Sequence, residues 1–334
     1  MTMVAARPSD GDEAIWRNDT PAMPESTFSR RVSVTDLGLL LFLGAVWGGA
    51  FLFLRIAAPE VGPVWAAEIR IAIGASVLLL IAGRRTFAVV RTRPRQFAIV
   101  GATFSAIPFS LLAFASLTLP TGFGALLNAS TPLFTAVLGV AILGQRLSQR
   151  AVVGLAIGVI AVFVLVGWAP IEPGPGLVLA AAAALGAAMS YAAAGTYVRR
   201  SMPGIGGLEL ATGQLSFGAL VLLPFAFASG APGVPSPAGI GALVAVGLVS
   251  TALAWPIFYQ VLSRTTPTVA STVTFIVPAF AIAWGGLVLG EAVGAQLIAG
   301  FGLILVSLAL ILGLRLPRMW LGLRVRQLAA TRPV

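Results

Sequence analysis

Few side chains in this chain have the chemistry to catalyse a reaction or hold a metal, and three useful residue types are missing altogether. The 334 residues include no Cys, no His and no Lys. Disulfides, thiolate and imidazole metal sites, histidine proton relays, lysine Schiff bases and lysine-dependent phosphate loops are therefore excluded. We expect no metal and no cofactor. The remaining chemistry is non-covalent binding through Arg, Asn, Thr, Trp and Tyr.

Two prolines near the centres of long apolar segments mark candidate binding positions. Pro132 and Pro278 each remove the hydrogen bond to the carbonyl four residues earlier, at Asn128 and Thr274, whose side chains are also polar. Inside a membrane such carbonyls need a partner. The sequence leaves two options open: a polar niche that meets a bound solute, or a permanent kink satisfied by a neighbouring Ser or Thr. Further helix kinks are predicted at Pro108 and Pro256, which free the carbonyls of Phe104 and Ala252.

Aromatic residues deep in apolar segments are the second group of candidates. Thr251, Trp255 and Tyr259 recur at four-residue spacing and so lie on one helix face, with Tyr259 better placed for the membrane interface. Trp47 lies between two glycines, where it could either pack or line a cavity. The residues predicted to bind a solute are Trp47, Asn128, Tyr191, Trp255, Thr274 and Arg70.

Arg70 is the one charge that lies well inside an apolar segment, roughly 10 Å into its helix at about 1.5 Å per residue. It could extend to the outer surface, pair with a carboxylate, or face a cavity and attract an anionic group. Glu68 lies two residues away and faces elsewhere on a helix. No carboxylate falls at a predicted midplane, so a proton-carrying acid is not visible and the mode of energy coupling stays open.

Ten apolar segments are long enough to cross a bilayer, which needs about 20 residues per helix. Hydrophobic residues make up 58% of the chain and charged ones only 10%, a composition that no water-soluble surface of this size tolerates. The segments are residues 37–54, 64–81, 97–117, 123–143, 152–168, 177–197, 208–228, 240–262, 269–289 and 297–314.

The arginines support this count, because short basic loops stay on the cytoplasmic side. All but Arg55 and Arg70 of the 21 arginines lie in the two tails or in alternate gaps between apolar segments. The sequence therefore predicts a mobile cytoplasmic tail at residues 1–36 and a basic cytoplasmic tail at 315–334. The net charge of +10 is spread over separate clusters beside the lipid bilayer, so no nucleic acid is expected as a partner.

An internal repeat indicates the architecture. When the chain is shifted by 146 positions, Pro132 meets Pro278, and glycines meet glycines at several further positions, including Gly144 with Gly290 and Gly154 with Gly300. Residues 37–168 and 169–314 then hold five segments each, and an odd number of crossings turns the halves upside down relative to each other. The predicted fold is an all-α membrane protein of ten transmembrane helices in a 5+5 inverted repeat.

The chain resembles the EamA-type branch of the drug/metabolite transporter superfamily. The resemblance rests on an ordered set of motifs: LGAVWGGAF at 43–51, Glu68-Ile-Arg70, Pro132 with Leu143-Gly144, Pro278 with Leu289-Gly290-Glu291, and Gly300. It covers about residues 37–314 and implies a cavity between helices 1, 3, 4, 6, 8 and 9. One departure is Gly144-Gln145, where the family has Gly-Glu, so only Glu291 keeps the acid that could act in capping or interhelical pairing.

These features together predict a multi-pass transporter of the cell membrane that exports a small organic solute by alternating access. The resemblance implies solutes such as amino acids or amphipathic drugs. Two other classes are a membrane scaffold or receptor that moves nothing, and an intramembrane enzyme. An enzyme is disfavoured because no acids, bases or nucleophiles are grouped at one depth.

Overall fold

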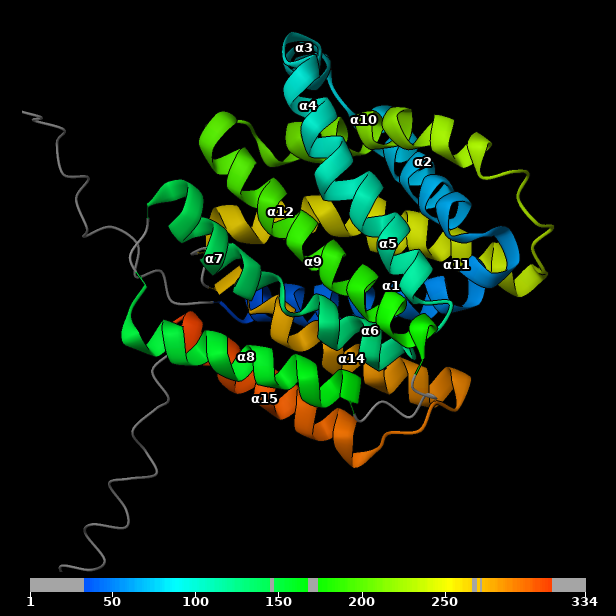
Figure 1. Ribbon diagram of the computed structural model, residues 1–334. Helices are drawn as coiled ribbons and strands as arrows, with labels where there is room; N and C mark the ends of the chain where they lie inside the picture. The colour runs from blue at the N-terminus through cyan, green and yellow to red at the C-terminus, as the bar shows by residue number, and fades with distance from the viewer. Residues whose placement is uncertain (1–32, 145–146, 168–173, 266–268, 271, 314–334) are drawn as a thin grey trace, which may run out of the picture. The chain divides into compact units, whose positions relative to one another are not determined.

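The computed structural model describes residues 33–144, 147–167, 174–265, 269–270 and 272–313, and all regular structure within them is helical (Figure 1). The predicted tails at 1–36 and 315–334 lie outside these residues except for positions 33–36, so their cytoplasmic location stays a prediction. The elements are α1 Val34–Val61, α2 Pro63–Ile81, α3 Arg84–Thr92, α4 Pro94–Gly101, η2 Ala102–Ala106, α5 Ile107–Ala115, α6 Thr121–Asn128, α7 Thr131–Leu143, α8 Gln149–Gly167, α9 Pro175–Ser201, α10 Gly207–Ala228, α11 Pro237–Gly247, η3 Leu248–Leu253, α12 Ala254–Arg264, α14 Val273–Leu289 and α15 Ala295–Ile311.

All ten apolar segments predicted from the sequence contain helix. Eight stretches are long and apolar enough to cross a membrane, and the last two segments hold the shorter apolar helices α14 and α15. The short helix α3, which lies in the arginine-rich gap after α2, was not predicted. The chain is therefore a helical protein with many apolar spans.

Side chains and glycines at several helix ends form recognisable caps. Ser33 and Asp36 form a reciprocal capping box at the start of α1, with Asp36 N donating to Ser33 Oγ at 3.0 Å. At the other end, α7 and α14 both terminate in a left-handed glycine, Gly144 at φ 63° and Gly290 at φ 66°. Glycine adopts this conformation at low cost and so stops the helix.

The prolines Pro108 and Pro256 follow two π-helical segments. Pro108 lies in the first turn of α5 directly after η2, and Pro256 lies in α12 directly after η3. In a π-helix each carbonyl pairs five residues ahead instead of four. The Ile107 N–H, for example, donates to the carbonyl of Ala102, five residues earlier.

The prolines Pro132 and Pro278 have different effects on their helices. The segment expected as one helix at 123–143 is divided: α6 ends at Asn128, a turn follows, and α7 begins with Pro132 in its first turn. Pro278 instead lies inside the continuous helix α14. The break exposes the end of α6 and its Asn128 to the interior of the bundle.

Glycines set the closest helix contacts. A Cβ at Gly48 of α1 would lie 2.8 Å from the backbone nitrogen of Ala281 in α14, and one at Gly154 of α8 would lie 2.8 Å from the carbonyl oxygen of Ser307 in α15. Both pairs of helices can therefore approach backbone to backbone. Gly48 and Gly154 each belong to a pair of glycines four residues apart, Gly44 with Gly48 and Gly154 with Gly158, a spacing typical of closely packed helices.

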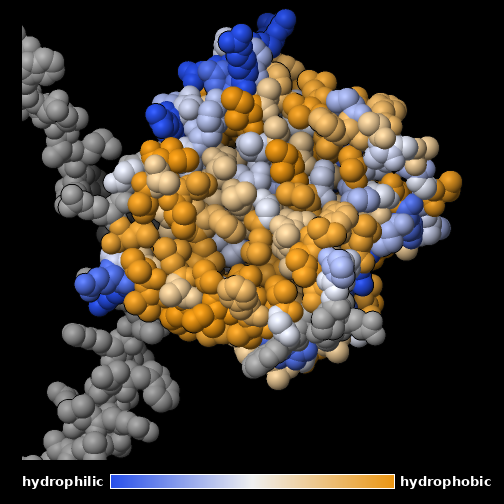
Figure 2. All heavy atoms as spheres, in the orientation of Figure 1, coloured by the Kyte–Doolittle hydropathy of each residue, from blue (hydrophilic) through white to orange (hydrophobic). Residues whose placement is uncertain are grey.

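The outward faces of α8 and α15 are apolar. Large side chains there are strongly exposed, with Phe163 at 73% and Ile298 at 61%. Figure 2 shows this apolar surface over α8 and α15 and a hydrophilic cluster around α3. An apolar face of this extent, with charge gathered at one end, is suited to contact with lipid.

Candidate functional site

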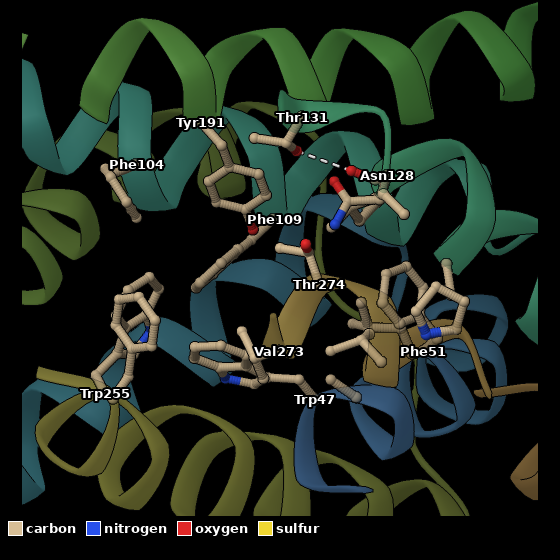
Figure 3. A pocket seen from close by; sticks show the side chains of 18 of the residues that line it. Trp47, Phe51, Phe104, Phe109, Asn128, Thr131, Tyr191, Trp255, Val273 and Thr274 are labelled. Atoms are coloured by element: carbon tan, nitrogen blue, oxygen red, sulfur yellow. Dashed lines mark hydrogen bonds between the residues drawn. The ribbon is translucent and has the colours of Figure 1, made fainter. Parts of the chain in front are cut away.

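A pocket of about 270 Å³ lies among the helices and is the candidate binding site (Figure 3). Side chains from spans in both halves of the chain line it. Its volume is just below the range of about 300–1,000 Å³ that is typical of pockets for drug-sized ligands, so it suits one small solute. The lining comes from Trp47, Ala50, Phe51, Leu54, Arg70, Phe104, Phe109, Leu112, Ala125, Asn128, Ala129, Thr131, Tyr191, Trp255, Phe258, Val273, Thr274, Val277 and Pro278.

The structure brings together all the residues that the sequence predicted to contact a solute. Each of Trp47, Arg70, Asn128, Tyr191, Trp255 and Thr274 lines the pocket, as does Pro278. Their role in binding stays a prediction. The family resemblance implied a cavity between spans 1, 3, 4, 6, 8 and 9. The predicted residues lie on five of these spans and on α2, which supplies Arg70, and span 3 contributes Phe104, Phe109 and Leu112 to the lining.

Aromatic rings form one wall of the pocket. The Trp47 ring centroid lies 5.5 Å from that of Trp255 and 5.3 Å from that of Phe258, and Phe104 packs edge-on to Trp255 at 5.2 Å. These separations are within the range of favourable aromatic pairs. Sequence reasoning missed Phe104 and Phe258, because a Phe in an apolar span looks the same whether it faces lipid or a cavity.

Arg70 is held at the edge of this aromatic wall. Only 4% of the residue is exposed, its Nε donates to Thr251 Oγ1 at 2.9 Å, and its Cζ lies 3.7 Å from the centre of the Phe109 ring. Thr251 in turn donates to the carbonyl of Val246 at 2.8 Å. Of the three options that the sequence left open for Arg70, the structure places it against the cavity, and no ion pair involves it among the described residues.

The opposite side of the pocket is more polar. The carbonyl of Asn128 accepts a hydrogen bond from Thr131 Oγ1 at 2.8 Å, so this carbonyl is satisfied by a neighbouring Thr, as one of the two sequence options proposed. The side-chain Oδ1 of Asn128 is buried and accepts no hydrogen bond from the described residues. Figure 3 shows the Asn128 amide and the Thr274 hydroxyl on the side of the pocket away from Phe104 and Trp255.

Two indole nitrogens differ in their bonding. Trp47 Nε1 donates to the carbonyl of Ser250 at 3.2 Å, which fixes the ring between α1 and η3. Trp255 Nε1 is buried and makes no hydrogen bond within the described part of the chain. An indole N–H without a hydrogen bond is unusual in a buried Trp. Trp255 and Asn128, on opposite sides of the pocket, therefore each have a buried polar atom without a partner among the described residues.

A polar network lies beyond one end of the pocket. Both carboxylate oxygens of Glu291 accept from the Thr121 backbone nitrogen, at 3.1 and 2.9 Å, and Oε1 also accepts from the Thr121 hydroxyl at 3.0 Å. Arg55 lies 3.9 Å from the same carboxylate and donates to the carbonyl of Ser116 at 2.6 Å. This network joins α1, the end of α5, the start of α6 and the segment after α14.

The space between the pocket and this network is nearly filled. A second cavity of only about 10 Å³ is lined by Phe51 and Leu112, which also line the main pocket, and by Ser116 and Thr121 of the network. That volume is at the lower limit for holding one water molecule. Among the described residues, this small cavity is the space found between the pocket and the network.

A central pocket within a bundle of apolar helices is the arrangement of a membrane transporter, and comparison with known proteins identifies the family. The profile of the EamA-like transporter family matches residues 37–167 and again residues 178–313. The chain belongs to this family. The resemblance stated from the sequence motifs is confirmed, and the protein is a multi-pass membrane protein of a transporter family.

Relatives in bacteria cover most of the chain. YoaV of Bacillus subtilis (strain 168), described as an uncharacterized transporter, is 23% identical over 76% of this chain and 89% of its own length. Protein PecM of Dickeya dadantii (strain 3937) is 27% identical over 80% of this chain and 88% of its own. One solved crystal structure superposes with a TM-score of 0.59 at 19% identity, covering 89% of this chain and 99% of the other, which shows a shared fold.

Proposed function

We propose that this protein is a secondary transporter of the cell membrane that exports small organic metabolites, such as amino acids or amphipathic drugs, by alternating access. The observation that carries the proposal is the pocket itself. It combines unused polar groups on Asn128 and Trp255 with a wall of aromatic rings, inside a bundle whose outer surface is apolar. Such a site can hold a solute that has both a polar and an apolar part.

The proposed topology is ten crossings in a 5+5 inverted repeat with both termini in the cytoplasm. The family profile matches twice along the chain, which supports two related halves. The π-helices add support, because Ala102–Ala106 and Leu248–Leu253 begin 146 positions apart, the same shift that aligns Pro132 with Pro278. Two related halves in opposite orientation give one pocket two equivalent routes of access.

We assign the network of Arg55, Glu291 and Thr121 to the outer end of the pocket. The gaps at 118–122 and 290–294 that surround it contain no basic residue, as expected of outer loops. Its contacts tie four helical segments together, so outward opening requires that they break. In this proposal, the structure represents the conformation in which the pocket is closed on the outer side of the membrane.

Flux through the pocket tests the transport proposal. A thermal-shift screen of purified protein against amino acids, sugars and cationic drugs selects a solute that stabilises the native state. Efflux of that solute from proteoliposomes is then measured for Trp255→Ala, Asn128→Ala and a control, Phe163→Ala, whose side chain is 73% exposed on α8. We expect losses of at least about tenfold for the pocket variants, since a missing apolar contact in a pocket costs about 10–200-fold, and little change for the control.

Three other results would contradict the proposal. Unaltered efflux in both pocket variants, when they are folded, would show that the pocket is not the binding site. A solute that stabilises the wild type but never crosses the liposome membrane would indicate a receptor, and a solute recovered in altered chemical form would indicate an enzyme.

The natural absence of Cys makes the topology directly testable. Ala231→Cys and Thr92→Cys each introduce one thiol at an exposed position, on either side of the membrane in the proposed topology. In intact cells we expect a membrane-impermeant maleimide to label Ala231→Cys alone. Labelling of Thr92→Cys under the same conditions would contradict the proposed topology, which places Thr92 on the cytoplasmic side.

A further inference from the structure

We propose that the pocket selects small organic anions, specifically a carboxylate joined to an aromatic or bulky apolar body, and that Arg70 is the residue that sets this preference. The inference rests on the proposed function, because it names the class of solute that the pocket takes. It is carried by the bonding of Arg70, by the charge of the pocket and by the arrangement of the aromatic wall.

The bonding of Arg70 leaves part of its guanidinium for a ligand. Nε is fixed by Thr251 Oγ1 at 2.9 Å, and the plane of the group lies over Phe109 at 3.7 Å. Among the described residues, the one hydrogen bond that Arg70 makes is through Nε, so its two terminal amino groups are not used there, although Arg70 lines the pocket. A guanidinium held in this way presents its remaining N–H groups in a planar fork, which matches the two oxygens of a carboxylate.

The charge of the pocket is not balanced by the protein. Five acidic residues lie in the described part of the chain, and none of them lines the pocket. The ion pairs found there are Arg55 with Glu291 and Arg85 with Glu209, so neither carboxylate serves Arg70. A cation buried in an apolar bundle is unfavourable without a counter-ion. A solute carboxylate supplies that counter-ion when it binds.

The aromatic wall alone would also suit an organic cation, because aromatic faces attract positive charge. Two observations favour the anion. The face of Phe109 is already covered by Arg70 itself, and any solute cation would lie in the same small pocket as that fixed positive charge. Trp47, Trp255 and Phe258 then serve as an apolar surface for the body of the solute, and the free Oδ1 of Asn128 can accept a hydrogen bond from a polar substituent.

A matched set of probes tests the charge preference without altering the protein. The probes are 3-phenylpropionate, its neutral amide 3-phenylpropionamide, and the cation 3-phenylpropylamine, which share one aromatic body. Affinity for the wild type in nanodiscs is measured by isothermal titration at pH 7. We expect the acid to bind at least about tenfold more tightly than the amide, with the amine weakest. An acid that fails to exceed its amide tenfold, whether both bind or neither does, overturns the proposal, as does preferential binding of the amine.

Variants then locate the preference at Arg70. We expect Arg70→Gln to reduce the affinity for the acid at least about tenfold while leaving the affinity for the amide within about twofold, and Arg70→Lys to restore part of the acid affinity. Phe163→Ala, on the outer face of α8, is the matched control. Equal losses for acid and amide in a folded Arg70→Gln protein would show a structural role and would contradict the assignment.

The same probes separate this inference from the transport proposal. Acid binding that depends on Arg70 but yields no flux in proteoliposomes would leave the inference standing and defeat transport. Flux of the amine in preference to the acid would leave transport standing and defeat the inference.

Discussion

The two halves of the chain share the features that shape the backbone and differ in the side chains that reach the pocket. At a shift of 146 positions, the π-helix Ala102–Ala106 corresponds to the start of Leu248–Leu253, and the left-handed Gly144 corresponds to Gly290. These positions act through the main chain. Their agreement indicates that both halves build their helices by the same devices.

The pocket-lining positions do not agree in the same way. At the same shift Arg70 corresponds to Ser216, and Phe109, whose ring lies under Arg70, corresponds to Trp255. The first half therefore supplies a cation and the second half supplies none. Further differences are Trp47 against Ala193, Tyr191 against Ala45 and Asn128 against Thr274. The two halves thus share backbone features at matched positions, whereas the positive charge in the pocket comes from the first half.

The contrast is sharpest where α2 meets η3 and where α10 meets η2. Where α2 meets η3, Arg70 donates a hydrogen bond to Thr251. Where α10 meets η2, the corresponding residues are Ser216 and Ser105. Both serine hydroxyl oxygens are buried and have no hydrogen-bond partner within the described residues. The same crossing of helices thus carries a charge-assisted hydrogen bond in one half and two unused hydroxyls in the other.

The largest effect on stability is expected from Thr251→Val. The change keeps the shape of the side chain but removes both the acceptor for Arg70 Nε and the donor to the Val246 carbonyl. Loss of a hydrogen bond to a charged group costs about 1.5–3 kcal/mol. The matched change in the other half, Ser216→Ala, should alter the free energy of unfolding by less than about 0.5 kcal/mol.

Thermal unfolding of both variants in one detergent measures this difference, and Thr251→Ser should recover most of the loss because it keeps the hydroxyl. Equal destabilisation by Thr251→Val and Ser216→Ala would show that the Arg70 hydrogen bond adds nothing beyond packing.

A smaller difference is expected between Gly154→Ala and Gly300→Ala, the matched glycines of α8 and α15. A Cβ at Gly154 would lie 2.8 Å from the carbonyl oxygen of Ser307, which can move only with its helix. At Gly300 the obstacle is the side chain of Leu165, which can rotate. We expect Gly154→Ala to cost about 1–2 kcal/mol, towards the lower end of the range for overpacking, and Gly300→Ala to cost less.

Unfolding in the same detergent compares the two variants, with Gly302→Ala as the control. A Cβ at Gly302 meets nothing within 4 Å, so this change should be neutral or slightly stabilising. If Gly300→Ala lowered the free energy of unfolding more than Gly154→Ala, the side chain of Leu165 would have to be held as rigidly as the backbone at Ser307.

The sequence predicted the features that depend on local composition. The apolar segments follow from the length that a bilayer demands, and Asn128 and Thr274 were notable because polar residues are rare in such segments. The close contact at Gly154 accords with its spacing of four residues from Gly158, a pattern visible in the sequence. Each of these signals can be read within one helix.

Features that depend on contacts between helices were not predictable in the same way. Phe104 and Phe258 are apolar on either face of a helix, and only the neighbouring rings show that they face the pocket. Pro132 lies in the first turn of a new helix, whereas Pro278 lies inside a continuous one. Yet each proline follows a polar residue, Asn128 or Thr274, by four positions. Whether a proline breaks its helix or only bends it depends on which groups can satisfy the carbonyl that the proline leaves free. At Asn128 that group is the hydroxyl of Thr131.

The smallest effect is expected from Glu291→Gln, which gives the second half the amide that Gln145 supplies in the first. The carboxylate lies at the start of α6, where it accepts from the Thr121 nitrogen, and it lies 3.9 Å from Arg55. Gln keeps one acceptor for Thr121 but loses the favourable negative charge at the start of a helix, which contributes about 0.3–1 kcal/mol. The gap in melting temperature between wild type and variant should narrow in high salt, because salt screens partly exposed charges. A gap that is the same at low and high salt would show that Glu291 acts through hydrogen-bond geometry alone, and the two halves would then differ less in this network than their charges indicate.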